Sequence, residues 1–224
     1  MYIVKQKEIS VPVEQLIHDA EQGVAVAQCY LGNCYDCGKG VEQDWNKAIY
    51  WWTKATEQGL VMAMNILGLQ YYYHGQEEPK YNEQAAYWYA KAAELGDANA
   101  QRWLGQCFLN GRGVEENHQE AVKWYTLAAE QDNGEAQYLL SICYERGIGV
   151  EANDSLSFYW CHKAAKQGLL DAQFALAARY YDQAKGVGYN MKKAIYWYKV
   201  AASQGHKGAK EALRMMRILH IRQR

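Results

Sequence analysis

The stretch LGNCYDCGKGVEQDWNKAIYWWTKA at residues 31–55 returns in outline at residues 104–129, as LGQCFLNGRGVEENHQEAVKWYTLAA. Both stretches contain a Leu-Gly pair, an aromatic residue, a Gly-x-Gly-Val loop and then an Ala-x-x-Trp segment that ends in Ala. Because these residues keep the same order and almost the same spacing, we interpret the two stretches as copies of one structural unit.

The unit occurs five times along the chain of 224 residues, with a period of 36 or 37 residues. A period in this range is typical of solenoid proteins, in which each repeat packs on its neighbours. Aligned on the small residue four positions before Leu, the repeats are expected at 27–62, 63–99, 100–135, 136–171 and 172–208. We expect an N-terminal arm and capping helix in residues 1–26, and a C-terminal capping helix with a basic tail in residues 209–224.

Each repeat contains the patterns of two helices. The first carries Ala, Leu and an aromatic residue at i, i+4 and i+8, which places them on one helical face, and a small residue usually follows the Leu. The second carries a small residue, aromatic residues at i+3 and i+4, and Ala at i+7, as in Ala121/Trp124/Tyr125/Ala128. We expect Trp124 to lie in the core, where truncation to Ala would cost about 3–5 kcal/mol.

Polar and glycine residues mark the ends of the second helices. Asx residues stand at the expected N-caps, and Asn117 with Glu120 predicts a capping box: Asp44, Asn117, Asn153 and Asn190. Glycines stand where the second helices should stop: Gly59, Gly96, Gly134, Gly168 and Gly205. Repeats 2 and 5 have a loop one residue longer than the others, so we expect those two loops to differ in shape.

The combined pattern A-x-x-x-L-G-x-x-Y-x-x-G-x-G-V…A-x-x-W-Y-x-x-A-A-x-x-G resembles the Sel-one-like repeat (SLR) family, which is related to tetratricopeptide repeats. The resemblance implies an all-α fold, a right-handed α/α superhelix (solenoid) of five helix-turn-helix repeats with half-repeat caps. It implies a scaffold or adaptor that binds a partner protein or peptide in a concave groove. A more specific form of this function is that of a bacterial immunity protein that sequesters a cognate toxin. An alternative function of a different class is that of a hydrolase, like those proposed for cysteine-rich SLR relatives.

Candidate partner-binding residues lie opposite the Leu stripe of each first helix. By similarity to tetratricopeptide repeats, this is the concave side. They are Cys29, Asn33, Asp36, Asn65, Leu69, Tyr72, Arg102, Gln106, Leu109, Tyr138, Ile142, Glu145, Phe174, Ala178 and Tyr181. Nine of these fifteen are apolar or aromatic and three are charged, which favours a binding groove over a solvated face. The alternative is that some of them pack against adjacent first helices.

The sequence contains no pattern that indicates catalysis or metal binding. Among the catalytic signatures we considered, it has no H-E-x-x-H, G-x-S-x-G or phosphate-loop motif, and we expect neither an enzyme nor a cofactor. Cys34 and Cys37 form a C-x-x-C at the end of a first helix, where the dipole disfavours thiolate. Cys107 and Cys143 occupy the repeat position of Cys34, so we interpret the three as small packing residues. The within-repeat disulfides of periplasmic SLR relatives do not fit, because repeats 2 and 5 have no cysteine.

The net charge and the hydropathy of the sequence limit the classes of partner and the cellular locations that we expect. The net charge is −1, which gives no electrostatic case for nucleic acid or an anionic membrane. No apolar run approaches the roughly 18 residues of a membrane span, and we expect a cytoplasmic location. We expect a monomer, with self-association through the end faces as an alternative. Residues 207–224 hold six Lys or Arg and one Glu, which predicts either a solvated face or a contact to an acidic partner.

Overall fold

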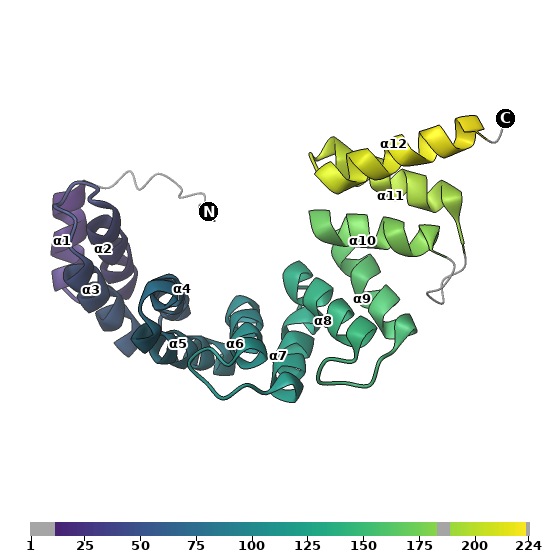
Figure 1. Ribbon diagram of the computed structural model, residues 1–224. Helices are drawn as coiled ribbons and strands as arrows, with labels where there is room; N and C mark the ends of the chain where they lie inside the picture. The colour runs from purple at the N-terminus through teal and green to yellow at the C-terminus, as the bar shows by residue number, and fades with distance from the viewer. Residues whose placement is uncertain (1–11, 183–188, 223–224) are drawn as a thin grey trace. The chain divides into compact units, whose positions relative to one another are not determined.

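The computed structural model describes residues 12–182 and 189–222. These residues form twelve α-helices and one short 3-10 helix, and no β-strand occurs among them. The chain divides into two compact units, residues 1–97 and residues 98–224, which are described separately. Within each unit, helices that follow one another in the sequence pack against each other (Figure 1).

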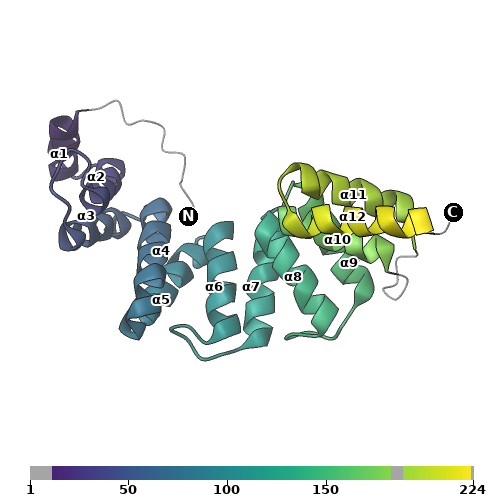
Figure 2. The ribbon, with the colours of Figure 1, turned by 45° about the horizontal axis from the view of Figure 1, so that its top comes forward.

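Unit 1 contains α1 (Val13–Glu21), α2 (Ala25–Cys37), α3 (Trp45–Glu57), α4 (Val61–Glu77), the 3-10 helix η1 (Pro79–Tyr81) and α5 (Asn82–Glu94). Unit 2 contains α6 (Ala98–Asn110), α7 (His118–Glu130), α8 (Gly134–Arg146), α9 (Asp154–Lys166), α10 (Leu170–Tyr181), α11 (Met191–Ser203) and α12 (Lys207–Arg222). Both views show α11 and α12 side by side in unit 2 (Figures 1 and 2).

The predicted fold class, an α/α solenoid of five helix-turn-helix repeats with half-repeat caps, is confirmed. The first helices are α2, α4, α6, α8 and α10, and the second helices are α3, α5, α7, α9 and α11. Each first helix begins two residues before the Ala on which the repeats were aligned. Among the described residues, α1 matches a second helix with no first helix before it, and α12 matches a first helix with no second helix after it.

The Leu stripe and the small residue beside it form the core as predicted. The five Leu side chains of the first helices are buried: Leu31, Leu67, Leu104, Leu140 and Leu176. A Cβ atom added to Gly32, Gly68 or Gly105 would lie 2.5–2.7 Å from a ring atom of Trp52, Tyr89 or Tyr125. The small residue is therefore required by the close approach of the second helix.

The prediction for Trp124 is wrong. Trp124 is half-buried, whereas the next residue, Tyr125, is completely buried. The same division holds in repeat 1, where Trp52 is buried and Trp51 is only half-buried. The second aromatic residue of each pair points at the small residue of the first helix, so it takes the core position.

The four predicted N-caps are confirmed. The side-chain oxygens of Asp44, Asn117, Asn153 and Asn190 accept hydrogen bonds from backbone N–H groups three residues later. Their own backbone N–H groups donate to a carbonyl of the aromatic residue that ends the core stripe of the first helix, at 2.8–2.9 Å. The N–H of Asn117 therefore donates to the carbonyl of Phe108 and not to the carboxylate of Glu120. Only half of the predicted capping box forms, the bond from the Glu120 N–H to the Asn117 side chain.

Four of the five predicted helix-stop glycines adopt a left-handed backbone: Gly59, Gly96, Gly168 and Gly205. The prediction for Gly134 is wrong, because Gly134 is the first residue of α8. The left-handed position in repeat 3 belongs to Asp132, with φ 60°, which follows the helix-ending Gln131 just as Gly follows Gln in repeats 1, 4 and 5. An Asp can adopt this conformation at a modest steric cost.

The longer loop of repeat 2 differs in shape, as predicted. Helix α4 runs on to Glu77, and η1 replaces the Gly-x-Gly turn before α5. The loop of repeat 5 falls at residues 183–188, outside the described residues.

A buried glutamine on the first helix bonds to the end of its own second helix in four of the repeats, and in repeats 1, 4 and 5 it also bonds to the preceding second helix. In repeat 1 the Nε2 of Gln28 donates to the carbonyl of Ala20 on α1, and its Oε1 accepts from Gln58 at the end of α3. We call this pair of side chains the glutamine clamp. It recurs as Gln101/Gln131, Gln137/Gln167 and Gln173/Gln204, with 2.8–3.0 Å between the two amides. Repeat 2 has Met64 and Leu95 in these two positions, so both amides are replaced together.

Candidate protein-binding site

The candidate residues fall into two sets, one on each unit. Unit 1 carries Cys29, Asn33, Asp36, Asn65, Leu69 and Tyr72 on α2 and α4, and unit 2 carries the other nine on α6, α8 and α10. Thirteen of the fifteen are half-buried, Tyr181 is exposed and Cys29 is completely buried. Cys29 packs in a core cluster with Trp52 and Leu67, so its prediction as a surface residue is wrong.

The candidates Asp36, Arg102 and Glu145 reach the first helix of the following repeat. The carboxylate of Asp36 on α2 accepts a hydrogen bond from the Nε2 of Gln70 on α4, at 3.1 Å. Arg102 on α6 lies with its Nε 3.1 Å from a carboxylate oxygen of Glu135 on α8. The alternative that some candidates pack against adjacent first helices therefore holds for these residues.

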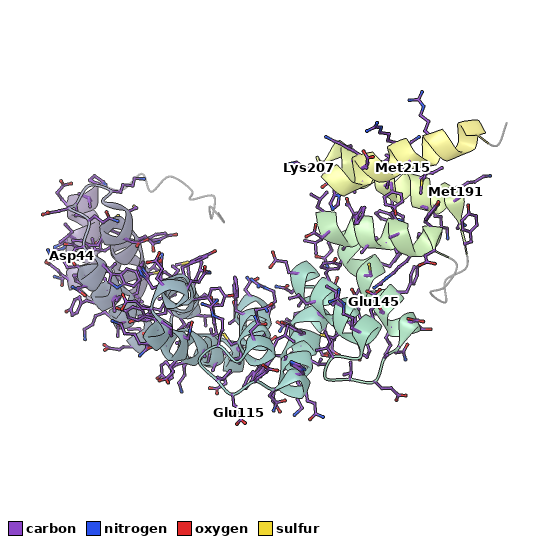
Figure 3. The ribbon with its side chains drawn as sticks, in the orientation of Figure 1. Asp44, Glu115, Glu145, Met191, Lys207 and Met215 are labelled. Atoms are coloured by element: carbon purple, nitrogen blue, oxygen red, sulfur yellow. The ribbon has the colours of Figure 1, made fainter. Side chains whose placement is uncertain are left out.

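The strongest of these links joins α8 to α10. One guanidinium nitrogen of the buried Arg179 donates to the carboxylate of Glu145 at 3.0 Å, and the other donates to the carbonyl of Ser157 at 2.9 Å. Glu145, labelled in Figure 3, is thereby held at the edge of α8 with about a quarter of its side chain exposed (26 %). A buried cation that is paired in this way fixes the position of the carboxylate.

Aromatic candidates of unit 2 lie on the same two helices as this ion pair, α8 and α10. Tyr138 packs against the core around α10, and burial raises the pKa of its hydroxyl, with a smaller contribution from Asp171. Phe174 is stacked on His206 with 4.3 Å between the ring centroids. Tyr181 lies 6.3 Å from the ring of Tyr189 and is the most exposed of the fifteen, at 37 %.

The candidates of unit 1 form a more polar set. The side-chain oxygen of Asn33 accepts a hydrogen bond from the indole N–H of Trp52 at 2.9 Å. Burial raises the pKa of the Asp36 carboxyl, while His74 and the bond from Gln70 oppose the rise. Leu69 and Tyr72 supply the apolar surface of this set, on α4.

Three exposed apolar residues of the first helices were missed by the sequence analysis. Val26, Met62 and Tyr73 are 39–47 % exposed and lie on α2 and α4. Val26 and Met62 occupy the second position of their helices, one helical turn from residues that were chosen, and extending the helical wheel by one turn would have found them.

A second series of exposed aromatic residues lies on the second helices. These tyrosines directly precede the half-buried Trp and are 50–58 % exposed: Tyr50, Tyr87, Tyr159 and Tyr196. Each makes an edge-to-face contact with the following Trp, at 4.9–5.3 Å between ring centroids. This series gives a comparison surface for the first-helix residues.

Five of the six cysteines are buried core residues, and Cys37 is exposed. Cys34, Cys107 and Cys143 are buried, which confirms the interpretation of that repeat position as a packing position. Burial raises the pKa of the Cys107 thiol to about 12 and that of Cys143 to about 11, so the thiols stay protonated at neutral pH. Among the side chains that the structure describes, no three His, Cys, Asp or Glu residues gather as a metal site would require.

Taken together, the fold and the recurring residues define an α/α solenoid of 36-residue repeats, a class of protein that presents surfaces to other macromolecules. The chain matches the Sel1 repeat family over residues 25–60, 61–97, 98–133, 134–169 and 170–206. It therefore belongs to the Sel1 repeat family, and the predicted resemblance is confirmed.

Solved structures and a curated relative agree with this assignment. A protective antigen of uropathogenic Escherichia coli with an SLR fold is 34 % identical, with a TM-score of 0.81, over 91 % of this chain and 44 % of the antigen. A Sel1 repeat protein from Oxalobacter formigenes is 33 % identical, with a TM-score of 0.79, over 89 % of this chain and 82 % of that protein. Chitin synthase regulatory factor 3 of Schizosaccharomyces pombe is 40 % identical over 99 residues, which are 42 % of this chain and 10 % of the yeast protein.

The chain thus spans less than half of the antigen and a tenth of the yeast protein. Sel1 repeat proteins generally mediate protein–protein interactions, and the repeat scaffold is typically non-catalytic. No helix in the described part of the chain is long and apolar enough to cross a membrane. The cytoplasmic location, the bacterial immunity role and the hydrolase alternative stay predictions.

Proposed function

We propose that this chain is a scaffold or adaptor that binds another protein or peptide on the first-helix face of its repeats. The observation that carries the proposal lies in unit 2. There, apolar side chains of α8 and α10 stay partly open to solvent after all contacts between the repeats are made: Tyr138, Ile142, Phe174, Ala178 and Tyr181. Such a row of apolar side chains is typical of a surface that contacts a partner.

The contacts around this row suit a binding surface. Phe174 and Tyr138 are held by His206 and by the core of α10, so a partner would meet rings whose rotamers are already fixed. Rigid aromatic anchors lose little conformational entropy on binding, which favours affinity. Glu145 and Asp171 provide negative charge at the edge of the row, and the Asp171 side chain is 71 % exposed.

The proposal includes the cytoplasmic location and the absence of a cofactor or a catalytic role. The raised thiol pKa values support the non-catalytic part, because none of the buried cysteines offers a ready thiolate. The scaffold role fits the general activity of the Sel1 repeat family.

A matched pair of double variants tests the proposal. Tyr72→Ala/Tyr181→Ala removes one tyrosine of the first-helix face from each unit, and Tyr87→Ala/Tyr159→Ala removes one exposed tyrosine of the second helices from each unit. Both variants remove the same atoms, and helical content by circular dichroism checks that both fold. Wild-type chain and both variants are used as baits in native lysate, and the captured proteins are then tested for direct binding with purified components.

The expected result is a purified partner that binds wild type and the second-helix variant with equal affinity, and the first-helix variant at least about tenfold more weakly. Equal binding by all three baits would contradict the assignment of the face. Loss of partner binding with the second-helix variant alone would indicate that the binding site lies at the tyrosines of the second helices. A partner that is a toxin, and whose activity the chain inhibits, would favour the immunity version of the role.

A further inference from the structure

The charge that is open to solvent on the first-helix face of α8 and α10 is mainly negative. Three carboxylates stand there, Glu135, Glu145 and Asp171, and their side chains are 35 %, 26 % and 71 % exposed. The cations paired with the first two lie deeper, since the side chain of Arg102 is 12 % exposed and that of Arg179 is 7 % exposed. A partner that approaches this face therefore meets carboxylates before it meets guanidinium groups.

Two of these carboxylates lie close to Tyr138, an aromatic member of the apolar row. Burial raises the pKa of the Tyr138 hydroxyl, and Asp171 and, more weakly, Glu145 add to the rise, which requires both charges to lie nearby. Asp171 also lies 3.7 Å from the Nε2 of His206, whose ring is stacked on Phe174. An aromatic ring with a carboxylate beside it suits a cationic side chain, because the ring face and the carboxylate both attract positive charge.

The acidic and apolar residues of α8 follow one line along the helix. Glu135, Tyr138, Ile142 and Glu145 stand at i, i+3, i+7 and i+10, which is one helical face. A rise of 1.5 Å per residue places the backbones of the two glutamates about 15 Å apart. Figure 3 labels Glu145, the second of the two. The line therefore has an apolar middle with a carboxylate at each end.

An extended segment of a partner matches this spacing. In such a segment the residues i, i+2 and i+4 point to one side, and residues i and i+4 are about 13 Å apart. The long side chains of Lys and Arg cover the remaining distance to the two carboxylates. An acidic segment would instead place like charges against Glu135 and Glu145, which costs free energy.

We propose that the partner carries an extended segment of the pattern basic-x-apolar-x-basic, and that this segment lies along α8. Its two basic residues lie at Glu135 and Glu145, and its apolar residue contacts Tyr138 and Ile142. The exposed Asp171, near Tyr138, adds to the attraction. This inference rests on the proposed function, because it names the chemistry of the partner that the first-helix face binds. The contact is partly ionic and partly exposed, so salt weakens it.

Fluorescence anisotropy with the full chain tests the proposal on two mixtures of short labelled peptides. One mixture contains Lys-x-Φ-x-Lys and the other contains Glu-x-Φ-x-Glu, where Φ is Phe, Tyr or Leu and the remaining residues are Ala, Gly or Ser. The Lys mixture should bind the wild type at least about tenfold more tightly than the Glu mixture at about 20 mM salt, and clearly more weakly at about 300 mM salt.

A matched pair of double variants locates the charge that the peptides detect. Glu135→Gln/Asp171→Asn neutralises two carboxylates of the first-helix face, and the new Gln side chain can still accept a hydrogen bond from Arg102. Glu151→Gln/Asp154→Asn makes the same changes on the loop before α9 and in its first turn, where both residues are exposed. The first variant should bind the Lys mixture about fivefold more weakly, and the second should bind it like the wild type.

Ile142→Ala separates this proposal from the proposed function, with circular dichroism as the check on folding. Loss of binding with Ile142→Ala, together with equal binding of the Lys and Glu mixtures, would overturn the basic partner and leave the first-helix face as the binding surface. Binding that neither Ile142→Ala nor Glu135→Gln/Asp171→Asn changes would count against both. The basic partner is also overturned if the two double variants lose affinity equally, or if the Lys mixture does not bind the wild type at up to about 1 mM.

Discussion

The glutamine clamp of repeat 4 allows a quantitative prediction. Gln137 is completely buried, and its Nε2 donates to the carbonyl of Ala129 at 3.1 Å and to Asp132 at 3.2 Å. Its Oε1 accepts from the Nε2 of Gln167 at 3.0 Å. Substitution of Gln137 by Met, the residue of repeat 2, removes all three bonds and keeps most of the volume. At a net 0.5–1.5 kcal/mol for each bond, the free energy of unfolding should fall by about 2–3 kcal/mol.

Urea unfolding of the wild type and Gln137→Met measures this change, and amide hydrogen exchange locates it. Protection should fall in α8 and α9 and stay constant in α2, which belongs to unit 1. The combination Gln137→Met/Gln167→Leu reproduces Met64 and Leu95 of repeat 2. It should cost less than the sum of the two single changes, because no buried amide is then left without its partner. A loss below about 0.5 kcal/mol for Gln137→Met, or strictly additive losses, would refute the reasoning.

Three further predictions concern packing and pH. Tyr125→Ala should lower the free energy of unfolding by about 3–5 kcal/mol and Trp124→Ala by clearly less, since only Tyr125 is completely buried; urea denaturation measures both, and the reverse order would contradict the core assignment. Gly105→Ala should cost about 1–3 kcal/mol, because the added Cβ would lie 2.7 Å from the Tyr125 ring; an unchanged melting temperature would show that the helices can separate without cost. Burial, with smaller effects of Lys166 and Lys193, lowers the pKa of His162 below its ordinary 6.5, so the unfolded chain takes up this proton first as the pH falls. The contribution of neutral His162 to the free energy of unfolding is therefore complete above about pH 6.5 and declines below it. His162→Gln should reduce the decline of the urea midpoint of unfolding below that pH, and parallel plots of midpoint against pH for the two proteins would contradict the prediction.

The repeat architecture was predictable because each structural role recurs at the same position. Leu31 and its four equivalents, the small residue beside each, and the Asx caps each repeat with the period of the fold. The misassigned Gly134 shows the limit of matching residue types. The left-handed residue is defined by its place directly after the C-cap of the second helix, and in repeat 3 that place holds Asp132.

The candidate site was less predictable, because a helical wheel shows which side of the helix a residue faces but not which residues of the next repeat cover it. Cys29 and Tyr138 share one repeat position, yet Cys29 is completely buried and Tyr138 is half-buried. The difference comes from the size of the side chain and from the next repeat, which covers the smaller residue. Arg179 is a similar case, since a cation in the position of Cys107 could be recognised as unusual, but its pairing with Glu145 depends on the contact between α8 and α10.

The glutamine clamp also has a consequence for how such a chain can change its length. The two amides of one clamp lie 30 or 31 residues apart, inside a single period, so a duplicated or deleted period carries both partners with it. The bond to the preceding repeat goes to a backbone carbonyl, as from Gln28 to Ala20, and every amino acid supplies that acceptor. Any repeat that carries the glutamine can therefore follow any other repeat without loss of this bond. Recombination between repeats therefore preserves the contact between neighbouring repeats. A solenoid of this kind can gain or lose repeats while the sequences of its individual repeats diverge.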